Sequence, residues 1–517
     1  MRTSEGRRWW ALGALSLSVL VVGLDLTVLN LALPTLATEL HASTAQLQWI
    51  VDAYSLVLAA LLLPAGLLGD RYGRKRLLLG ALLVFGVASL ACAYAASAGE
   101  LIAARAVLGL GAAFIIPLSL SVIPVLFAEE ERQRAITITL GATFVAFPIG
   151  PILGGWLLTH YWWGSVFLIN GPVIAVALLA VAMLMPESRS SARPRLDLAG
   201  IVVSSLGLAG FTYGAIEAGQ KGWSGGALVA MLAGAAVLVA FVGWERRVAR
   251  RPGGQPLVDL TLFRSASFTW GTILATVVTF AMFGLLFAVP QYFQAVRGTD
   301  ALGAGLRLLP LIGGLLVGAQ TADRLAPRIG AKATVALGFA VMAAGLGAGA
   351  TTSLHTSDGF TLTWVAVLGA GLGLALPTAV DAALGVLSQE RSGAGSALIL
   401  AVRQVGATIG VAVLGSVLNA GYHARLDVTG LPSQLGAAVR DSAAAGVAVA
   451  QQLGSAPLLD SVRAAFVHGM DLLLWTCGGL AVGGVMLALM FLPRRAEAVA
   501  AKAAERAGSE DEVVVRG

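Results

Sequence analysis

Residues 66–76 read Gly-Leu-Leu-Gly-Asp-Arg-Tyr-Gly-Arg-Lys-Arg and separate two long apolar runs. The glycines allow a tight reversal of the chain between two helices. Asp70 can cap a helix or pair with a cation in one conformation and be released in another. The stretch therefore predicts a loop that gates a helical bundle, or one whose cations only anchor it at a membrane surface. The residues that we expect to act in gating are Gly66, Asp70, Arg71, Gly73 and Arg74.

The composition around this loop is that of a membrane protein. The chain has 517 residues, of which 57% are hydrophobic and 12% are charged, whereas soluble domains carry about 25% charged residues. Cys92 and Cys477 both lie in apolar runs, so we expect no disulfide framework and no metal site. The net charge of +6 is spread between apolar runs rather than concentrated on one soluble face, which argues against nucleic-acid binding.

The apolar runs have the length of membrane-spanning helices. A bilayer core of about 30 Å needs roughly 20 apolar residues per helix. Fourteen segments meet this condition, at residues 11–33, 48–69, 76–97, 101–127, 135–159, 165–186, 198–217, 226–244, 268–290, 303–322, 333–351, 362–387, 396–420 and 470–492. We interpret the first as a retained helix and not as a signal peptide, because it is too long and contains Asp25.

The distribution of Lys and Arg predicts the orientation. The termini and the connections on their side of the membrane carry 26 of the 34 Lys and Arg residues, and the connections on the other side carry 5. Because cytoplasmic connections are enriched in Lys and Arg, we expect both termini to lie in the cytoplasm of a multi-pass protein of the cell membrane.

An internal repeat relates the two halves. Val-Leu-Gly-x-Gly at 107–111, with a proline at 117, recurs at 367–371 with a proline at 377. Asp70-Arg71 has a counterpart in Asp323-Arg324. We therefore expect two related six-helix bundles with two helices inserted between them. The predicted units are an N-terminal bundle at 1–190, two inserted helices at 191–262, a C-terminal bundle at 263–493 with an outer helical hairpin at 421–468, and a disordered cytoplasmic tail at 494–517.

Five acidic residues lie within or at the edge of a predicted helix: Asp25, Asp52, Glu217, Asp381 and Asp471. An acid inside a bilayer is costly and is a functional hypothesis by default. A carboxylate in a dry cavity can exchange a proton for a cation. Asp25 is the deeper of the two acids in the first helices, and we expect it to couple proton and substrate, with Asp52 beside it. The alternative for Asp25 is local capping by Thr27 or Asn30.

Several motifs together resemble the major facilitator superfamily. The loop at 66–76 is similar to its inner-loop signature. Further stretches resemble its fourteen-helix drug:proton antiporter family, and within it the Qac-type efflux pumps; they lie at 24–34, 49–56, 150–155, 167–172, 290–294, 308–310 and 403–406. The resemblance implies an all-α major facilitator fold with fourteen transmembrane helices around a central cavity. It also implies that Asp381 borders this cavity as a second proton or substrate site, unless it pairs with Arg105, Arg403 or the backbone near Pro377.

The resemblance also implies roles for glycines and a buried cation. Gly150, Pro151, Gly154 and Gly155 are similar to the antiporter signature, although Ala146 replaces a further glycine; the alternative is that they only aid packing. Arg105 matches a pattern linked to proton transfer, although Leu108 stands where the family usually has Gln.

The aromatic and acidic residues near the outer surface admit two interpretations. We consider Trp49, Tyr54 and Phe147 as cation-binding surfaces, with interfacial or packing roles as the alternative. Glu217 is a candidate accessory acid, and simple solvation explains Glu217 and Asp471 equally well.

The expected function is proton-coupled export of lipophilic, often cationic drugs or antiseptics by alternating access. The alternative is a dedicated exporter of an endogenous metabolite, antibiotic or lipid. No phosphate-binding loop is found in the sequence, so we expect neither an enzyme nor an ATP-driven pump, and no catalytic residue. Expected partners are the substrates, protons and the bilayer, with the proton gradient in place of a cofactor and a monomeric protein.

Overall fold

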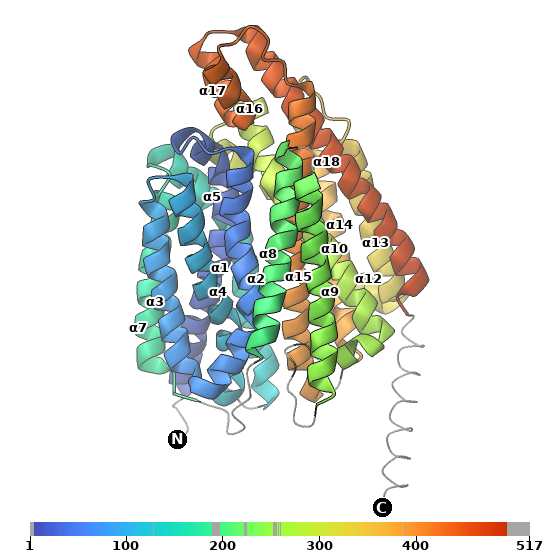
Figure 1. Ribbon diagram of the computed structural model, residues 1–517. Helices are drawn as coiled ribbons and strands as arrows, with labels where there is room; N and C mark the ends of the chain where they lie inside the picture. Colours follow the sequence, from blue (N-terminus) through green and yellow to red (C-terminus); the bar gives the residue numbers. More distant parts are fainter. Residues whose placement is uncertain are drawn as a thin grey trace, which may run out of the picture.

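The computed structural model is a bundle of long helices (Figure 1). It describes residues 5–127, 129–188, 197–221, 225–251, 256, 258, 260–387 and 389–493. No strand occurs among these residues. The predicted tail at 494–517 lies outside them.

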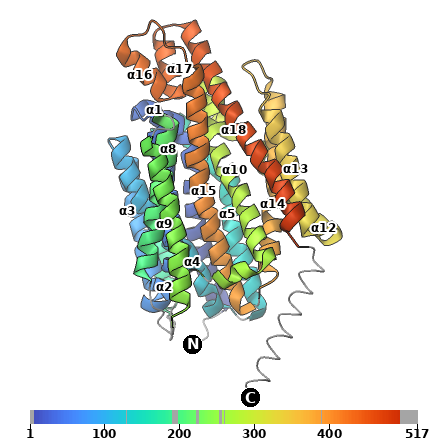
Figure 2. The same cartoon turned by 45° about the vertical axis from the view of Figure 1, so that its right-hand side comes forward.

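The helices of the first half form one group. They are α1 (Glu5–Glu39), α2 (Thr44–Tyr72), α3 (Arg74–Ala93), α4 (Ala98–Leu126), α5 (Glu129–His160), the single turn α6 (Ser165–Leu168) and α7 (Asn170–Leu184). Two more helices follow, α8 (Leu198–Lys221) and α9 (Gly225–Ala249). Figure 2 shows α8 and α9 side by side next to α15, and α8 packs on both α15 and α2.

The second half forms the other group. Its elements are η1 (Leu260–Arg264), α10 (Ala266–Gln291), the π-helical turn η2 (Tyr292–Val296), α11 (Ala301–Arg307), α12 (Leu309–Ile329), α13 (Ala331–Gly349), α14 (Asp358–Leu384), α15 (Gln389–Arg425), α16 (Ser433–Asp441), α17 (Ala443–Gln452) and α18 (Ala456–Phe491). Thirteen segments of the described chain are long and apolar enough to cross a membrane. The helix α5, with 32 residues, packs along α1 as a fourteenth. The prediction of an all-α membrane protein with fourteen long helices is confirmed.

The internal repeat has a physical counterpart in helix packing. On α4, Gly109 lies against the backbone of α2 and Gly111 against α3. On α14, Gly369 lies against the backbone of α12 and Gly371 against α13. A Cβ at any of these four positions would collide with the neighbouring helix. The repeated Gly-x-Gly pair therefore lets one helix approach two neighbours closely in each half.

The segment at 421–468 differs from the predicted two-helix hairpin. It contains α16 and α17, and residues 456–468 are the first turns of the 36-residue helix α18. Ser442 separates α16 from α17, because its backbone is extended and its side chain accepts a hydrogen bond from the Ala445 N–H. Helix capping by this serine ends one helix and starts the next. Figure 1 shows α16 and α17 opposite the end where α1 begins; we call these the hairpin end and the terminal end.

The two halves are joined at the hairpin end. The side chain of Gln294 donates to the Leu31 carbonyl over 2.9 Å, and Gln48 donates to the Ala412 carbonyl over 3.2 Å. Helix α11 of the second half also packs on α5 of the first. These contacts close the hairpin end of the seam between the halves.

Candidate functional site

A buried ion pair lies inside the first half. The Nη1 atom of Arg105, on α4, lies 2.5 Å from Oδ2 of Asp25, on α1, and the two side chains are 1% and 2% exposed. Arg105 Nε donates to the Ile50 carbonyl over 3.1 Å. The guanidinium also lies 4.3 Å from the centre of the Tyr54 ring. Asp25, Arg105 and Tyr54, all predicted site residues, therefore form one cluster.

The local capping alternative for Asp25 does not describe this arrangement. Thr27 Oγ1 donates to the carbonyls of Gly23 and Leu24. Asn30 Nδ2 donates to the carbonyl of Leu26 over 2.9 Å. The charge of Asp25 is instead balanced by Arg105, from a helix 80 residues away in sequence.

The close packing of α2 on α4 explains why Arg105 reaches both partners. Gly109, one turn after Arg105, lies against the backbone of Tyr54. This approach places the Tyr54 ring and the Ile50 carbonyl beside the guanidinium. A buried ion pair is strongly destabilised when one partner is removed, by about 3–5 kcal/mol, because the other charge stays buried without compensation. The cluster is therefore sensitive to the protonation of Asp25.

A small cavity lies between the two halves. It is lined by Thr27, Asn30, Pro151, Met282, Leu286, Leu308, Leu311, Ile312, Leu315, Leu316 and Leu372. Its volume is about 30 Å³, which is close to the share of one water molecule in the liquid. A substrate of drug size therefore requires the halves to separate. Apart from two side chains of α1, the wall is apolar, and the Oδ1 atom of Asn30 has no hydrogen-bond partner in the described part of the chain.

Helix α1 connects the ion pair with this cavity. Successive helical residues turn by about 100°, so Thr27 and Asn30 lie roughly 140° to 160° around the helix from Asp25. One face of α1 thus carries the carboxylate toward α4, and the other borders the seam. In this conformation Asp25 does not line the cavity.

Asp52 is a different kind of acid. It lies on α2 and is fully buried, and neither carboxylate oxygen has a hydrogen-bond partner among the described residues. It follows Gln48 by one helical turn and so shares the face of α2 that contacts α15. Asp52 therefore lies at the junction of the two halves. Burying a carboxylate without a partner is costly in its charged form.

The glycines of α5 pack on both halves. Gly150 and Gly154 lie against Thr27 and Val28 of α1, with no room for a Cβ. The predicted close helix approach is therefore present.

The other side of α5 faces α11, across the seam. A Cβ on Gly155 would lie 2.6 Å from the Leu302 Cα and 2.8 Å from the Ala301 carbonyl oxygen. Gly305 of α11 in turn lies against the carbonyl of Pro151. This second contact places the motif at the contact between the two halves.

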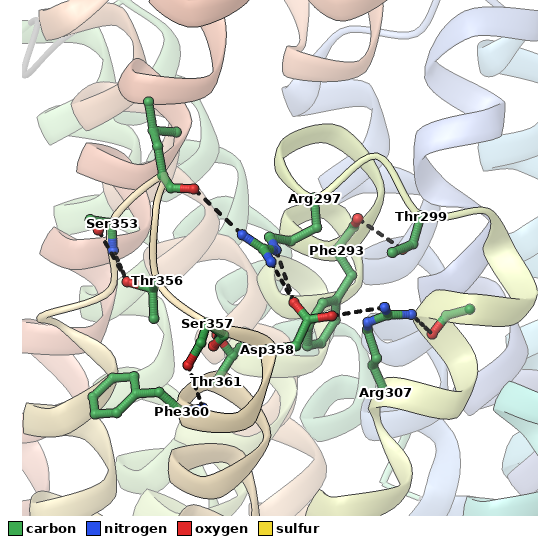
Figure 3. Close-up of polar contacts among 12 residues, drawn as sticks. Phe293, Arg297, Thr299, Arg307, Ser353, Thr356, Ser357, Asp358, Phe360 and Thr361 are labelled. Atoms are coloured by element: carbon green, nitrogen blue, oxygen red, sulfur yellow. Dashed lines mark hydrogen bonds and ion pairs between the residues drawn. The ribbon is translucent and has the colours of Figure 1, made fainter.

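A charged network that the sequence analysis did not identify anchors α11 (Figure 3). Asp358, at the start of α14, accepts from Arg297 Nη2 over 2.5 Å and from Arg307 Nη2 over 2.9 Å. Arg297 Nη1 also donates to the Leu354 carbonyl over 3.4 Å. Arg307 is the last residue of α11. The sequence signal was limited to Arg297 before the predicted helix at 303–322 and Arg307 within it, and their acidic partner lies more than 50 residues away.

The stretch at 66–76, predicted as a loop, is the end of α2 and the start of α3, with Gly73 alone outside the two helices, and it packs against the chain that follows α7. Gly73 has a φ of +116°, a conformation that favours glycine. The Arg74 N–H donates to the Ser188 carbonyl over 3.0 Å, and Arg76 lies 3.6 Å from Glu187. Arg71 is exposed, Gly66 is half-buried, and the Asp70 side chain lies outside the described atoms. The gating role of this loop stays a prediction.

The remaining predicted acids are dispersed. Asp381 is exposed near the end of α14, and its two alternative arginine partners are engaged elsewhere. Arg105 binds Asp25, and Arg403 Nε donates to Thr279 over 3.1 Å. Asp471 is half-buried on α18.

Of the predicted aromatic residues, only Tyr54 joins the buried cluster. Trp49 and the accessory acid Glu217 line a separate cavity at the hairpin end. The Phe147 side chain lies outside the described atoms.

Comparison with known proteins agrees with this architecture. The model of the Major Facilitator Superfamily matches residues 15–411. The tetracenomycin C resistance and export protein of Streptomyces glaucescens is 32% identical over 95% of this chain and 93% of its own length. The multidrug efflux pump LfrA of Mycolicibacterium smegmatis is 36% identical over 90% and 92%. The methyl viologen resistance protein SmvA of Salmonella typhimurium is 32% identical over 92% and 96%.

A solved structure shares the fold. It is a bacterial homologue of the human lysosomal transporter Spinster, in an inward-facing and occupied conformation, with a TM-score of 0.70, 16% identity and coverage of 96% of this chain and 99% of that one. The fourteen long helices, the repeated halves and the family match lead to one conclusion. The chain belongs to the major facilitator superfamily of membrane transporters.

Proposed function

We propose that this transporter exports lipophilic, often cationic compounds in exchange for protons by alternating access. The observation that carries the proposal is the buried pair of Asp25 and Arg105, because a proton on Asp25 removes the negative charge that balances a buried guanidinium. The efflux relatives support the direction of transport.

In this scheme, movement of α1 couples proton binding to substrate binding, and the proton and the substrate do not compete for one carboxylate. With Asp25 ionised, the pair holds α1 against α4. A proton on Asp25 weakens this contact, and α1 can then shift or rotate. The cavity face of α1, with Thr27 and Asn30, moves with it. Proton binding thereby changes the wall on which the substrate rests.

Asp52 serves as a second proton-binding group in this scheme. Its carboxylate has no hydrogen-bond partner in the described part of the chain and lies at the contact of α2 with α15, so separation of the halves would admit water to it. Hydration favours the charged form of an acid. Asp52 would then release its proton when the seam opens and recover it when the seam closes. Asp381, exposed near the terminal end, is an acid that a substrate would pass first.

The apolar wall of the central cavity favours lipophilic substrates. Two observations support a positively charged substrate. Acids are embedded in the helices, and the chain is similar to a relative named for resistance to methyl viologen, an organic dication. The second candidate is a dedicated exporter of one antibiotic or metabolite. The relative named for tetracenomycin C resistance and export favours that alternative.

The proposed setting is the cell membrane of a bacterium, with both termini in the cytoplasm and the hairpin end outside. The excess of Lys and Arg on the terminal side supports this orientation. The proposed working unit is the monomer, because each chain contains both halves of the seam. The proton gradient supplies the energy.

The test is uptake of a fluorescent lipophilic cation into inverted vesicles under an imposed proton gradient. Asp25→Asn should abolish gradient-driven uptake, and Asp25→Glu, which keeps a carboxylate, should retain part of it. Asp460→Asn, an exposed acid on α18, is the matched control and should behave as the native protein. Undiminished uptake by a folded Asp25→Asn protein would refute the coupling role. Absence of uptake by the folded native protein would favour the dedicated exporter.

A further inference from the structure

A larger cavity opens at the hairpin end, away from the central seam. Its volume is about 460 Å³, within the range of small-molecule sites. It is lined by His41, Ser43, Ala45, Gln46, Trp49, Tyr213, Ile216, Glu217 and Asp441. These residues come from the start of α2 and the turn before it, the end of α8, and the end of α16.

The lining chemistry suits an aromatic cation. Glu217 and Asp441 bring two carboxylates to one cavity, and among the described lining residues His41 is the one that can carry a positive charge. Trp49 and Tyr213 add two aromatic rings, whose faces attract cations. Ile216 and Ala45 form an apolar floor that is part of a buried cluster with Ala412. Charge, π surface and apolar contact are thus combined within a space of drug size.

The cavity is held in place by specific contacts around α16. Thr44 Oγ1 donates to the Asp441 carbonyl over 2.9 Å. The Tyr422 hydroxyl donates to the Val439 carbonyl over 2.7 Å, and His423 Nε2 lies 2.9 Å from the Arg440 carbonyl. These bonds tie α16 to α2 and α15. The Asp441 carboxylate is therefore carried on a fixed helix rather than on a free loop.

We propose that this cavity is a peripheral binding site for planar aromatic organic cations at the outer membrane surface. It shares no lining residue with the central cavity. It exists because an inserted helix, α8, and the outer helix α16 meet the start of α2. A cation there rests its ring on Trp49 and Tyr213 and its charge near Glu217 and Asp441. The inference goes beyond the proposed export function, since it requires neither proton coupling nor movement of the halves.

The site should weaken at acid pH. Burial raises the pKa of the Asp441 carboxyl, and the nearby His423 partly opposes this rise. As pH falls through this raised pKa, Asp441 becomes neutral. The other ionisable groups around Asp441 are His41 and Glu217 in the cavity, His423 on α15 and Arg440 on α16. Cation affinity should therefore decrease as the pH falls through the raised pKa of Asp441.

The test measures occupancy at the site itself, in the full-length protein in lipid nanodiscs without a gradient. A cysteine at the exposed cavity position 46 (Gln46→Cys) is labelled with a maleimide, and ethidium is the probe. The native Cys92 and Cys477 are buried. Ethidium should protect position 46 and not a control cysteine at the exposed position 453 (Leu453→Cys).

Removal of the lining charges gives the decisive comparison. In the Gln46→Cys background, Glu217→Gln with Asp441→Asn should raise the half-protecting ethidium concentration by about fivefold or more. The matched control is Asp460→Asn, which removes an acid of the same outer region that does not line the cavity. Equal protection in both proteins, or no protection of position 46 by ethidium, would overturn the proposal. Because no gradient is applied, failure of proton-coupled export leaves this result unaffected.

Discussion

Replacing Asp25 and replacing Arg105 should lower the stability of the protein by different amounts. Asp25→Asn leaves the guanidinium of Arg105 charged and 1% exposed, because arginine keeps its proton at any working pH. We expect a loss of about 3–5 kcal/mol in the free energy of unfolding. Arg105→Gln leaves Asp25, which can bind a proton and become neutral, so its loss should be smaller. Loss of the contact between Arg105 and the Tyr54 ring accounts for about 0.5–2 kcal/mol of the effect of Arg105→Gln and for none of the effect of Asp25→Asn.

The double variant separates charge balance from transport. With Asp25→Asn and Arg105→Gln together, two amides replace two charges, and stability should return to within about 2 kcal/mol of the native protein. The assay is unfolding of the purified protein in mixed detergent and SDS, followed by helical content, alongside vesicle uptake. Uptake should remain lost in the double variant, because it cannot bind the proton. A double variant as unstable as Asp25→Asn, or a fully stable Asp25→Asn protein, would refute the reasoning.

Four further outcomes follow from single positions. Asp52→Asn should leave the free energy of unfolding within about 1 kcal/mol of the native value, because no partner among the described residues is lost. The same variant should take up substrate more slowly under a proton gradient, and uptake at the native rate would contradict this. Gly155→Val should force α5 from α11 and increase maleimide labelling of an Ala304→Cys reporter, and unchanged labelling would refute it. Asp358→Asn removes two ion pairs, each worth at most about 1 kcal/mol at this exposure, so hydrogen exchange should rise in α11 and not in α3. Burial raises the pKa of Asp441 in the folded protein, so ionisation of this carboxyl lowers the stability as the pH rises through that pKa. Asp441→Asn should therefore stabilise the protein at pH 8 and not at pH 3. Thermal unfolding at the two pH values measures this difference.

The sequence alone predicted the features that depend on the composition of a single helix. The apolar runs had the length of membrane spans, and all but one correspond to helices that meet the same test in the structure. The exception is α5, which packs along α1 as expected. The paired Gly-x-Gly patterns at 107–111 and 367–371 predicted related halves, because close helix approach leaves a direct trace in residue size.

In the outer segment at 421–468, the bounds of the helices could not be predicted from composition. The helical periodicity of the Ala-rich blocks at 433–452 and 458–468 is the basis of the hairpin predicted at 421–468. The structure ends α16 at Asp441, restarts the chain after Ser442 and merges the second block with α18. Composition alone does not distinguish these outcomes, because all three pieces have helical periodicity.

The sequence places Asp25, Asp52 and Arg105 in runs long enough to span a bilayer. The folded chain shows that Asp25 pairs with Arg105, whereas the Asp52 carboxylate has no hydrogen-bond partner among the described residues. The physical reason is that pairing depends on distance in space between side chains of different helices. That distance is set by helix rotation and by glycine contacts such as Gly109 on Tyr54, and it leaves no trace in the spacing of residues along the chain.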